Sequence, residues 1–280
     1  MMISFAFSTR DLAGSGIADR LIRRLGLVCN STEDPRVAIV CRSSVTTVIG
    51  FREDVIFLEY LDQYFPDSDL VAILSRHSSS AEIPSLTIHY TGNPRRESSF
   101  GGRPMELSYT RPSVSNAFLR NLREVVFERG ISEYYKVSFE ATHHGPTSNK
   151  KPIVFLEIGS SEDKWRDPLL HEVWVDAIMR TLSGRNIECS KVAVGVGGPH
   201  YSERFTRMCF EEKYCFSHII PRYAVKELST SDLLSLISQA IEKTLERVSA
   251  VVVERKSVDS KTMKSIENTF SREDLEVVRI

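Results

Sequence analysis

The chain has 280 residues, of which 41% are hydrophobic and 26% are charged, and its formal net charge at pH 7 is −1. These values are ordinary for a globular protein and exclude a globally disordered chain. The near-neutral balance gives no sign of a nucleic-acid partner for the chain as a whole, although basic side chains could still gather locally. The length fits one large domain, and we expect a single α/β domain over residues 1–280.

Short apolar runs alternate with amphipathic patterns along most of the chain. Strands are predicted at 3–8, 37–41, 55–58, 70–75, 86–90, 135–141, 153–158, 191–196, 250–254 and 276–280. Helices are predicted at 14–25, 113–130, 167–182, 202–213 and 231–248, with a short helix between the last two strands. Ser113 and Asp167 are the predicted N-caps of their helices. The alternation predicts a largely parallel sheet flanked by helices on both faces.

Residues 91–112 (TGNPRRESSFGGRPMELSYTRP) differ from the rest because they are rich in Gly, Pro, Arg and Ser. They predict a long loop, and loops of this length inside a compact domain are usually functional or disordered. No internal repeat and no sharp change in composition divides the chain into two domains. The loop is therefore the main excursion that we expect from the α/β domain.

The five cysteines form no C-x-x-C motif and are odd in number, at positions 29, 41, 189, 209 and 215. This usage is typical of unpaired thiols in a reducing compartment, and we expect no structural disulfide. Residues 1–8 lack the basic start and small-residue cleavage site of a signal peptide. No apolar run approaches the roughly 18 residues that a membrane span needs. We therefore expect a cytoplasmic protein without a membrane partner.

Four predicted strands end in polar residues: SRHSSS (75–80), FEATHHGPT (139–147), EIGSSE (157–162) and GVGGPHYSER (195–204). In an open parallel sheet, ligands bind outside the carboxyl ends of the strands, so we expect these four clusters to share one edge. Simpler alternatives exist for the first three clusters, in order a solvated turn, a histidine pair that caps a loop, and a salt bridge to a neighbouring base, and the glycines of the fourth are a weak signal alone. The shared location favours the functional interpretation.

The second cluster is the most informative, because Glu140, His143 and His144 lie within five residues at a strand end. Three titratable groups so close together are rarely inert. Gly145-Pro146 breaks the strand, so both histidines are expected to project near the sheet edge. Histidines with an upstream glutamate suit either metal binding or general acid–base chemistry, and the residues alone leave both alternatives open.

The other clusters could complete this centre. Glu157 shares a face with apolar residues of its strand and therefore needs a cation, a metal or a strong donor. The Gly197-Gly198 turn, which precedes His200, would offer free amides to a phosphate or a developing oxyanion. The sequence contains no Walker loop, no G-x-S-x-G elbow and no H-E-x-x-H motif. Activated water is therefore favoured over a covalent serine.

Five segments together resemble the archaeal and plant type of D-aminoacyl-tRNA deacylase: SRHSS (75–79), YTGNP (90–94), FEATHHGPTS (139–148), EIGSSEDKW (157–165) and GVGGPHYSERFT (195–206). They span most of the chain in the right order. The resemblance implies an enzyme that hydrolyses the ester between a D-amino acid and the 3′ end of tRNA. It also implies a monomer with two zinc ions per subunit. The implied fold is a mixed-sheet α/β sandwich similar to bacterial peptidyl-tRNA hydrolase and purine nucleoside phosphorylase.

For a D-aminoacyl-tRNA substrate, we expect Glu140, His143 and His144 to form the catalytic centre. Candidate zinc ligands are His77, His143, His144, His200 and Glu157. Candidate substrate-binding residues are Gly197, Gly198, Ser78 and Ser79, with Arg95, Arg96 and Lys150 as phosphate contacts, alongside Arg103, Arg111 and Lys151. One aromatic residue could stack on the single-stranded terminal base, and Tyr90, Phe100 and Tyr201 are within sequence reach.

Two alternatives remain from the sequence. A nucleoside phosphorylase-like enzyme or another hydrolase on the same fold would act on free nucleosides and ignore charged tRNA. A non-catalytic RNA-binding module would need a strong basic stripe and salt-sensitive binding, which the near-neutral charge argues against. The expected partner is tRNA charged with a D-amino acid, and no obligatory protein partner is inferred.

Overall fold

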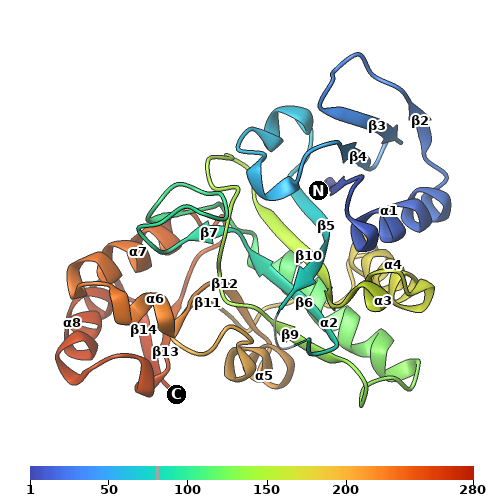
Figure 1. The fold of residues 1–280 in the computed structure, drawn as a ribbon. Helices are drawn as coiled ribbons and strands as arrows, with labels where there is room; N and C mark the ends of the chain where they lie inside the picture. Colours follow the sequence, from blue (N-terminus) through green and yellow to red (C-terminus); the bar gives the residue numbers. More distant parts are fainter. Residues whose placement is uncertain (80–81) are drawn as a thin grey trace.

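The structure, a computed structural model, describes residues 1–79 and 82–280, and most of the strands in these ranges belong to two sheets (Figure 1). Strands β1, β4, β5 and β10 of the first sheet run parallel to one another, whereas β6 is antiparallel to β10. From one edge to the other this sheet contains β2 (Val28–Asn30), β3 (Val37–Arg42), β4 (Thr47–Phe51), β1 (Ile3–Ser8), β5 (Leu70–Ser78), β10 (Ile153–Ser160), β6 (Ser85–Tyr90) and β9 (Lys136–Phe139).

The second sheet is wholly parallel, and its strand β12 contacts β6 of the first sheet. Its order is β12 (Tyr214–Ile220), β11 (Lys191–Val196), β13 (Ala250–Val253) and β14 (Glu276–Arg279). A small hairpin of β7 (Gly92–Asn93) and β8 (Glu106–Leu107) lies within the predicted loop. The mixed, largely parallel α/β class is confirmed, but the strands form two sheets where we expected one.

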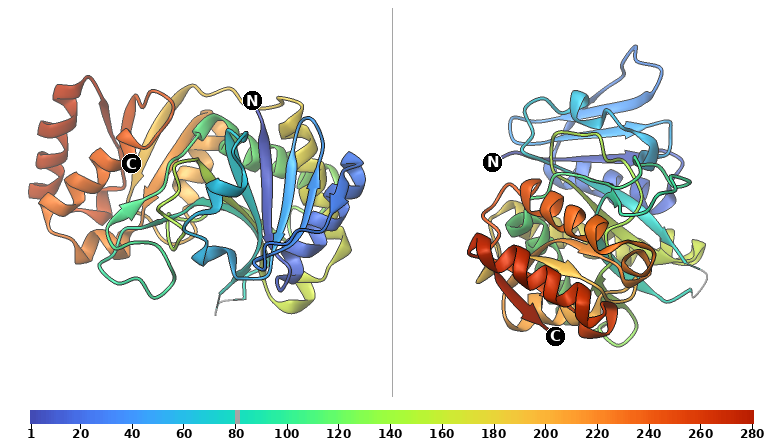
Figure 2. Two further views of the ribbon diagram at one scale, coloured as in Figure 1. Left: turned by 90° about the horizontal axis from the view of Figure 1, so that it is seen from above. Right: turned by 90° about the vertical axis from the view of Figure 1, so that its left-hand side faces the viewer.

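Helices cover both sheets, as Figure 2 shows from two further directions. One face of the first sheet packs against α1 (Leu12–Leu25), α2 (Pro112–Glu128) and α4 (Pro168–Leu182), which share an apolar core with Leu156 of β10. The opposite face is covered by two 3-10 helices, Val55–Phe57 and Leu61–Tyr64. The remaining helices are α3 (Glu162–Trp165), α5 (Glu203–Glu211), α6 (Arg222–Glu227), α7 (Thr230–Glu242) and α8 (Ser260–Phe270). Within the described ranges, none of the helices combines the length and the apolar character that crossing a bilayer requires.

Several predicted elements need correction. Residues 55–58 are not a strand, because Asp54 accepts a hydrogen bond from the Ile56 amide and caps a 3-10 helix there. Ser113 is not the N-cap of α2, since its amide and hydroxyl both donate to Glu246 and the helix begins at Pro112. Helix α7 ends at Glu242, earlier than predicted. Strands β2, β4 and β12 were not predicted from the sequence.

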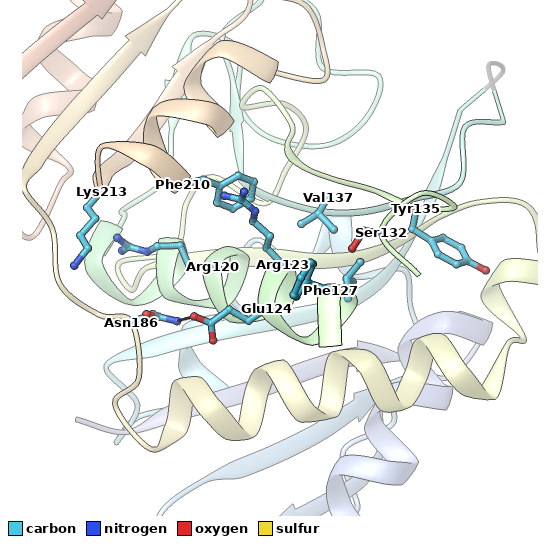
Figure 3. A pocket seen from close by; sticks show the side chains of 11 residues that line it. Arg120, Arg123, Glu124, Phe127, Ser132, Tyr135, Val137, Asn186, Phe210 and Lys213 are labelled. Atoms are coloured by element: carbon cyan, nitrogen blue, oxygen red, sulfur yellow. Dashed lines mark hydrogen bonds between the residues drawn. The ribbon is translucent and has the colours of Figure 1, made fainter. Parts of the chain in front are cut away.

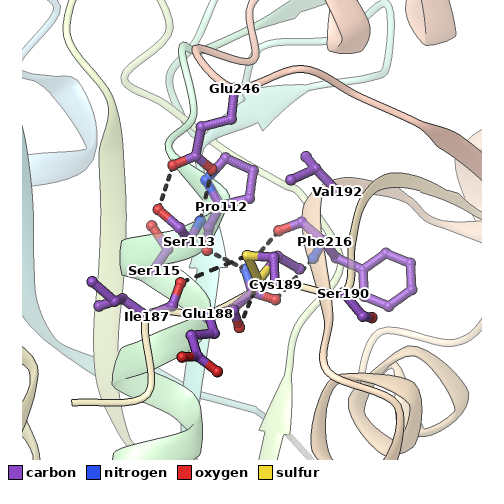
Figure 4. The surroundings of a disulfide bond; sticks show 12 residues. Pro112, Ser113, Ser115, Ile187, Glu188, Cys189, Ser190, Val192, Phe216 and Glu246 are labelled. Carbon is purple, nitrogen blue, oxygen red and sulfur yellow. Dashed lines mark hydrogen bonds between the residues drawn. A yellow bond between two sulfur atoms is a disulfide. The ribbon is translucent and has the colours of Figure 1, made fainter. Parts of the chain in front are cut away.

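The expectation of unpaired thiols is wrong for four cysteines. Cys29 and Cys41 form a disulfide across the antiparallel pair β2–β3, where they are register partners. Cys189 and Cys215 form a second disulfide, which ties the segment before β11 to β12 (Figure 4). Cys209 is buried and remains a free thiol. The first pairing depends on strand β2, which the sequence pattern did not reveal.

Thiol titration tests this arrangement directly. We expect one reactive thiol per chain in denatured, unreduced protein, that of Cys209, and all five cysteines after reduction. The Cys189–Cys215 bond closes a segment with a sequence separation of 26, so its removal by the double substitution to serine should lower the free energy of unfolding. The expected loss is about 3 kcal/mol, measured by denaturant unfolding without reductant. Five thiols before reduction would contradict the assignment.

Candidate active site

A set of five histidines and two glutamates, called here the histidine cluster, lies against the face of the first sheet that the 3-10 helices cover. Side chains alternate along a strand, so Glu157 shares this face with Phe155, while Leu156 and Ile158 point to the helical face. The neighbouring strands β5 and β6 contribute His77 and His89 in the same way. The members of the cluster are His77, His89, His143, His144, His200, Glu140 and Glu157.

The segment after β9 is held over the sheet by backbone hydrogen bonds. The amide of Glu140 donates to Ile88 of β6 (2.9 Å), and the amide of Ala141 donates to His200 (2.8 Å). The carbonyl of His144 accepts from Gly92 (2.8 Å). His144 has a positive φ of 45°, a conformation that costs energy for a residue with a side chain and that is common at functional sites. These hydrogen bonds hold His143, His144 and His200 close together over β6.

Glu140 lies at the centre of the cluster and is 1% exposed. Its Oε1 is 3.0 Å from Nδ1 of His77, and its Oε2 is 2.9 Å from Nε2 of His200 and 3.7 Å from Nε2 of His143. Glu157 is also buried, with Oε2 3.3 Å from Nδ1 of His77 and 3.7 Å from Nε2 of His89. Two carboxylates in a buried site require compensating positive charge.

The protonation states follow from this arrangement. Burial opposes ionisation of Glu140, but His200 and His77 outweigh it and hold the pKa of this carboxyl well below its usual range. Burial likewise opposes protonation of His77, yet Glu140 and Glu157 raise its pKa to about 11. Burial and the neighbouring His89 lower the pKa of His144 to about 4, and they also lower that of His143. His143 and His144 are therefore neutral at physiological pH and keep a free lone pair.

Sequence reasoning missed His89, which completes a group of three histidines with His143 and His144. Their ring centroids are 4.1 Å and 4.8 Å from that of His89. In each ring Nδ1 lies beside a backbone carbonyl, that of Tyr90, Ala141 or Gly145, at 2.7 to 3.1 Å. These contacts fix the tautomer and leave Nε2 as the ligand atom, which is the usual environment of metal-bound histidine. The alternation of Ser85, Thr87 and His89 in the apolar strand was the available signal.

Two further observations fit a metal ion. Both carboxylate oxygens of Glu140 and Nε2 of His89 are buried. The contacts of the Glu140 oxygens with His77 and His200 are short but lack the geometry of a hydrogen bond, and Nε2 of His89 has no hydrogen bond with any of the described residues. The ligand atoms of two groups, His89–His143–His144 and His77–Glu140–His200, lie within 4.8 Å of one another in each group. Imidazole and carboxylate are also the ligands that zinc accepts. The residues present therefore suit the metal that the sequence resemblance implies.

Comparison with known proteins shows to which family the chain belongs. The family model of D-aminoacyl-tRNA deacylase matches residues 64–278. A D-aminoacyl-tRNA deacylase of Staphylothermus marinus is 39% identical over 269 residues, which is 93% of each chain. The chain belongs to the D-aminoacyl-tRNA deacylase family. A relative of the same name from Aeropyrum pernix is 39% identical over 272 residues and 95% of each chain. A crystal structure described as a conserved protein of unknown function has a TM-score of 0.86 at 27% identity, covering 99% of this chain and 95% of its own.

Contrary to what we expected, the four polar clusters do not meet at one edge of a parallel sheet. Strand β9 pairs in parallel with β6 and therefore runs opposite to β5 and β10, so its carboxyl end does not lie at their edge. Strand β11 belongs to the second sheet. In this member of the deacylase family, the cluster forms where the chain after β9 crosses the face of one sheet and meets the end of β11 from the other.

The Gly197-Gly198 turn does not offer the free amides that we expected. The amide of Gly197 donates to the Ile220 carbonyl at 2.7 Å, and that of Gly198 donates to Glu254 at 3.0 Å. Arg222 also donates to the Glu254 carboxylate. The carboxylate of Glu254 thus occupies the position at which this turn would bind an anion. The turn serves instead to fix the backbone next to His200.

None of the other predicted substrate contacts belongs to the histidine cluster, although Arg95 lies in the wall of a pocket that opens on His143 and His144. Arg95 pairs with Glu227 at 3.0 Å, and Arg96 pairs with Asp232 at 2.8 Å. These ion pairs attach the 91–112 loop to α6 and α7. Lys150 is exposed, as is Ser78 at the end of β5, whereas Ser79 is half-buried. Ser80, in the SRHSSS motif, lies outside the described residues.

Two cavities matter for the position of the site. One cavity of about 620 Å³ lies beside α2, where Arg123 is placed over the ring of Phe210 (Figure 3), and no residue of the histidine cluster lines it. A smaller pocket of about 220 Å³ opens directly on His143 and His144. Its remaining walls come from residues 93–101 and from Tyr223. Of these two cavities, the smaller one has histidines of the cluster in its wall.

Proposed function

We propose that the protein hydrolyses the ester bond of D-aminoacyl-tRNA and releases free D-amino acid and tRNA. The observation that carries the proposal is the buried histidine cluster, open to a pocket at His143 and His144, in a chain of the D-aminoacyl-tRNA deacylase family. Ester hydrolysis needs an activated water, stabilisation of the negative charge on the carbonyl oxygen, and a proton for the leaving 3′ oxygen. Neutral His143 and His144 and the ionised carboxylate of Glu140 provide suitable groups.

We further propose that the cluster holds two zinc ions. His89, His143 and His144 would hold one ion through Nε2, and His77, Glu140 and His200 would hold the other. Zinc would supply Lewis-acid chemistry, by polarising the ester carbonyl and making water more acidic. The Tyr201 hydroxyl lies 3.1 Å from Nε2 of His77 and leaves Nδ1 directed at Glu140.

The protein's own side chains have distinct parts in this proposal. Glu140 stays ionised, so it supplies negative charge and can accept a proton at its carboxylate oxygens. Glu157 orients His77 and His89 and balances their charge. His143, His144 and His200 are the partly exposed members of the cluster, and the substrate ester would approach from their side. We propose that the protein acts as a monomer in the cytoplasm, where aminoacylated tRNA is made and used.

Deacylation of matched D-Tyr-tRNA and L-Tyr-tRNA tests the function. We expect substoichiometric protein to release D-tyrosine through many turnovers and to act far more slowly on the L-form. The same reaction after chelation tests the dependence on zinc. Release of a base from free nucleosides, with charged tRNA left intact, would instead favour the phosphorylase-like alternative. Stoichiometric binding without turnover would favour the RNA-binding alternative.

A further inference from the structure

The pocket at His143 and His144 contains two aromatic side chains. Phe100 is 72% exposed and Tyr223 is 38% exposed, although large apolar rings are usually covered. Of the three aromatic residues that the sequence suggested for base stacking, Phe100 is the one in this pocket. Tyr90 is 3% exposed in the core, and the Tyr201 hydroxyl contacts His77. The geometry therefore separates Phe100 from the other two.

The backbone that carries Phe100 is held firmly, although the ring is exposed. The Phe100 carbonyl accepts a hydrogen bond from the amide of Gly145, next to His144, at 3.2 Å. Glu59 accepts from the amide of Gly102 at 3.1 Å and from that of Thr147 at 2.9 Å, so one carboxylate joins the loop to the histidine segment. Gly101 has a φ of 72°, and an added Cβ there would lie 2.4 Å from the Ile56 carbonyl oxygen. The backbone that carries the ring is thus held beside the histidines before any ligand binds.

The wall formed by Tyr223 is held by the segment that follows β13. Tyr223 follows Arg222, whose guanidinium donates to Ser257 and to the buried Glu254. Burial raises the pKa of Tyr223 to about 12, so its hydroxyl is protonated at neutral pH. The loop is in turn attached to α6 by the pair of Arg95 with Glu227. Phe100 and Tyr223 are therefore both carried by backbone that is held by hydrogen bonds or ion pairs.

We propose that this pocket receives the adenine base at the 3′ end of tRNA, packed against Phe100 and Tyr223. The inference rests on the proposed deacylase function. Every tRNA ends in the same adenosine, whereas the amino acid attached to it differs from one D-aminoacyl-tRNA to another. A small pocket with fixed walls suits the adenosine, which is the constant part of the substrate. The volume of about 220 Å³ is below the roughly 300–1,000 Å³ of pockets for drug-sized ligands and suits one ring system. Aromatic side chains are the usual platform for an unpaired base.

Small esters test the assignment. We would compare kcat/KM for 3′-O-D-tyrosyl-adenosine with kcat/KM for D-tyrosine ethyl ester, which lacks a base. The wild-type protein should prefer the adenosine ester by about ten- to a hundredfold. Phe100→Ala should lower this ratio by about tenfold or more, whereas Phe100→Trp should keep it. Phe127→Ala, a matched change of a 76% exposed phenylalanine on α2, should leave the ratio unchanged.

The outcomes separate this inference from the proposed function. If Phe100→Ala leaves the ratio unchanged while wild-type protein deacylates D-Tyr-tRNA, the inference is wrong and the function stands. If Phe100→Ala instead alters the preference between D-tyrosyl and D-alanyl esters, the pocket receives the amino-acid side chain. If wild-type protein hydrolyses neither D-Tyr-tRNA nor the esters, the proposed function and the inference both fail.

Discussion

Glu140→Gln is expected to lower kcat/KM for D-Tyr-tRNA by about a thousandfold, within the range for loss of a catalytic acid–base group. Glutamine keeps the size of the side chain but removes the negative charge that faces His77, His143 and His200. The amide would also place a donor against imidazole nitrogens in a buried site. Because the interior screens charge poorly, the loss should be felt by all three rings.

Glu133→Gln is the matched control, since this glutamate is exposed and lies in the turn before β9. It should retain wild-type activity. Circular dichroism and thermal unfolding of both variants would show whether Glu140→Gln remains folded. A folded Glu140→Gln protein with more than about a tenth of the wild-type kcat/KM would contradict the central role of Glu140.

The sequence predicted local features better than their assembly. The strand 191–196 and the helix that ends at Leu182 were predicted with the observed bounds, because their apolar periods and terminal signals agree. The 55–58 run was misread, since a short apolar segment does not distinguish a strand from a 3-10 turn. Strand β2 is fully exposed and carries no hydrophobic pattern, which explains why it and its disulfide were missed.

The histidine cluster was predicted in part because most of its members end strands. His89 was missed because it lies inside β6, where its neighbours Thr87 and Phe155 reveal a shared face only once the pairing is known. The Gly197 amide is occupied by the Ile220 carbonyl, and the Gly198 amide by Glu254, more than 50 residues away in sequence. No local pattern could show that an internal carboxylate takes the position of an anion.

Removal of one histidine of the cluster should have a large effect on the zinc content of the protein. We expect purified protein to carry about two zinc ions per chain, and His89→Ala to carry about one. His89 supplies one of three Nε2 atoms in its group, and two remaining histidines leave an incomplete, weakly binding set. Deacylation should fall with the lost ion, and removal of zinc by a chelator should lower activity until zinc is returned.

His171→Ala is the matched control for this experiment, because His171 is also buried but lies on α4, with Nε2 next to the Trp165 carbonyl. It should keep both zinc ions, so a general loss of stability is distinguished from loss of a ligand. Glu140→Gln should remove the other ion, and combining it with His89→Ala should leave the chain without zinc. If His89→Ala and wild-type protein carry equal amounts of zinc, the three-histidine group does not hold a metal ion, and the fixed tautomers of its rings serve proton transfer instead.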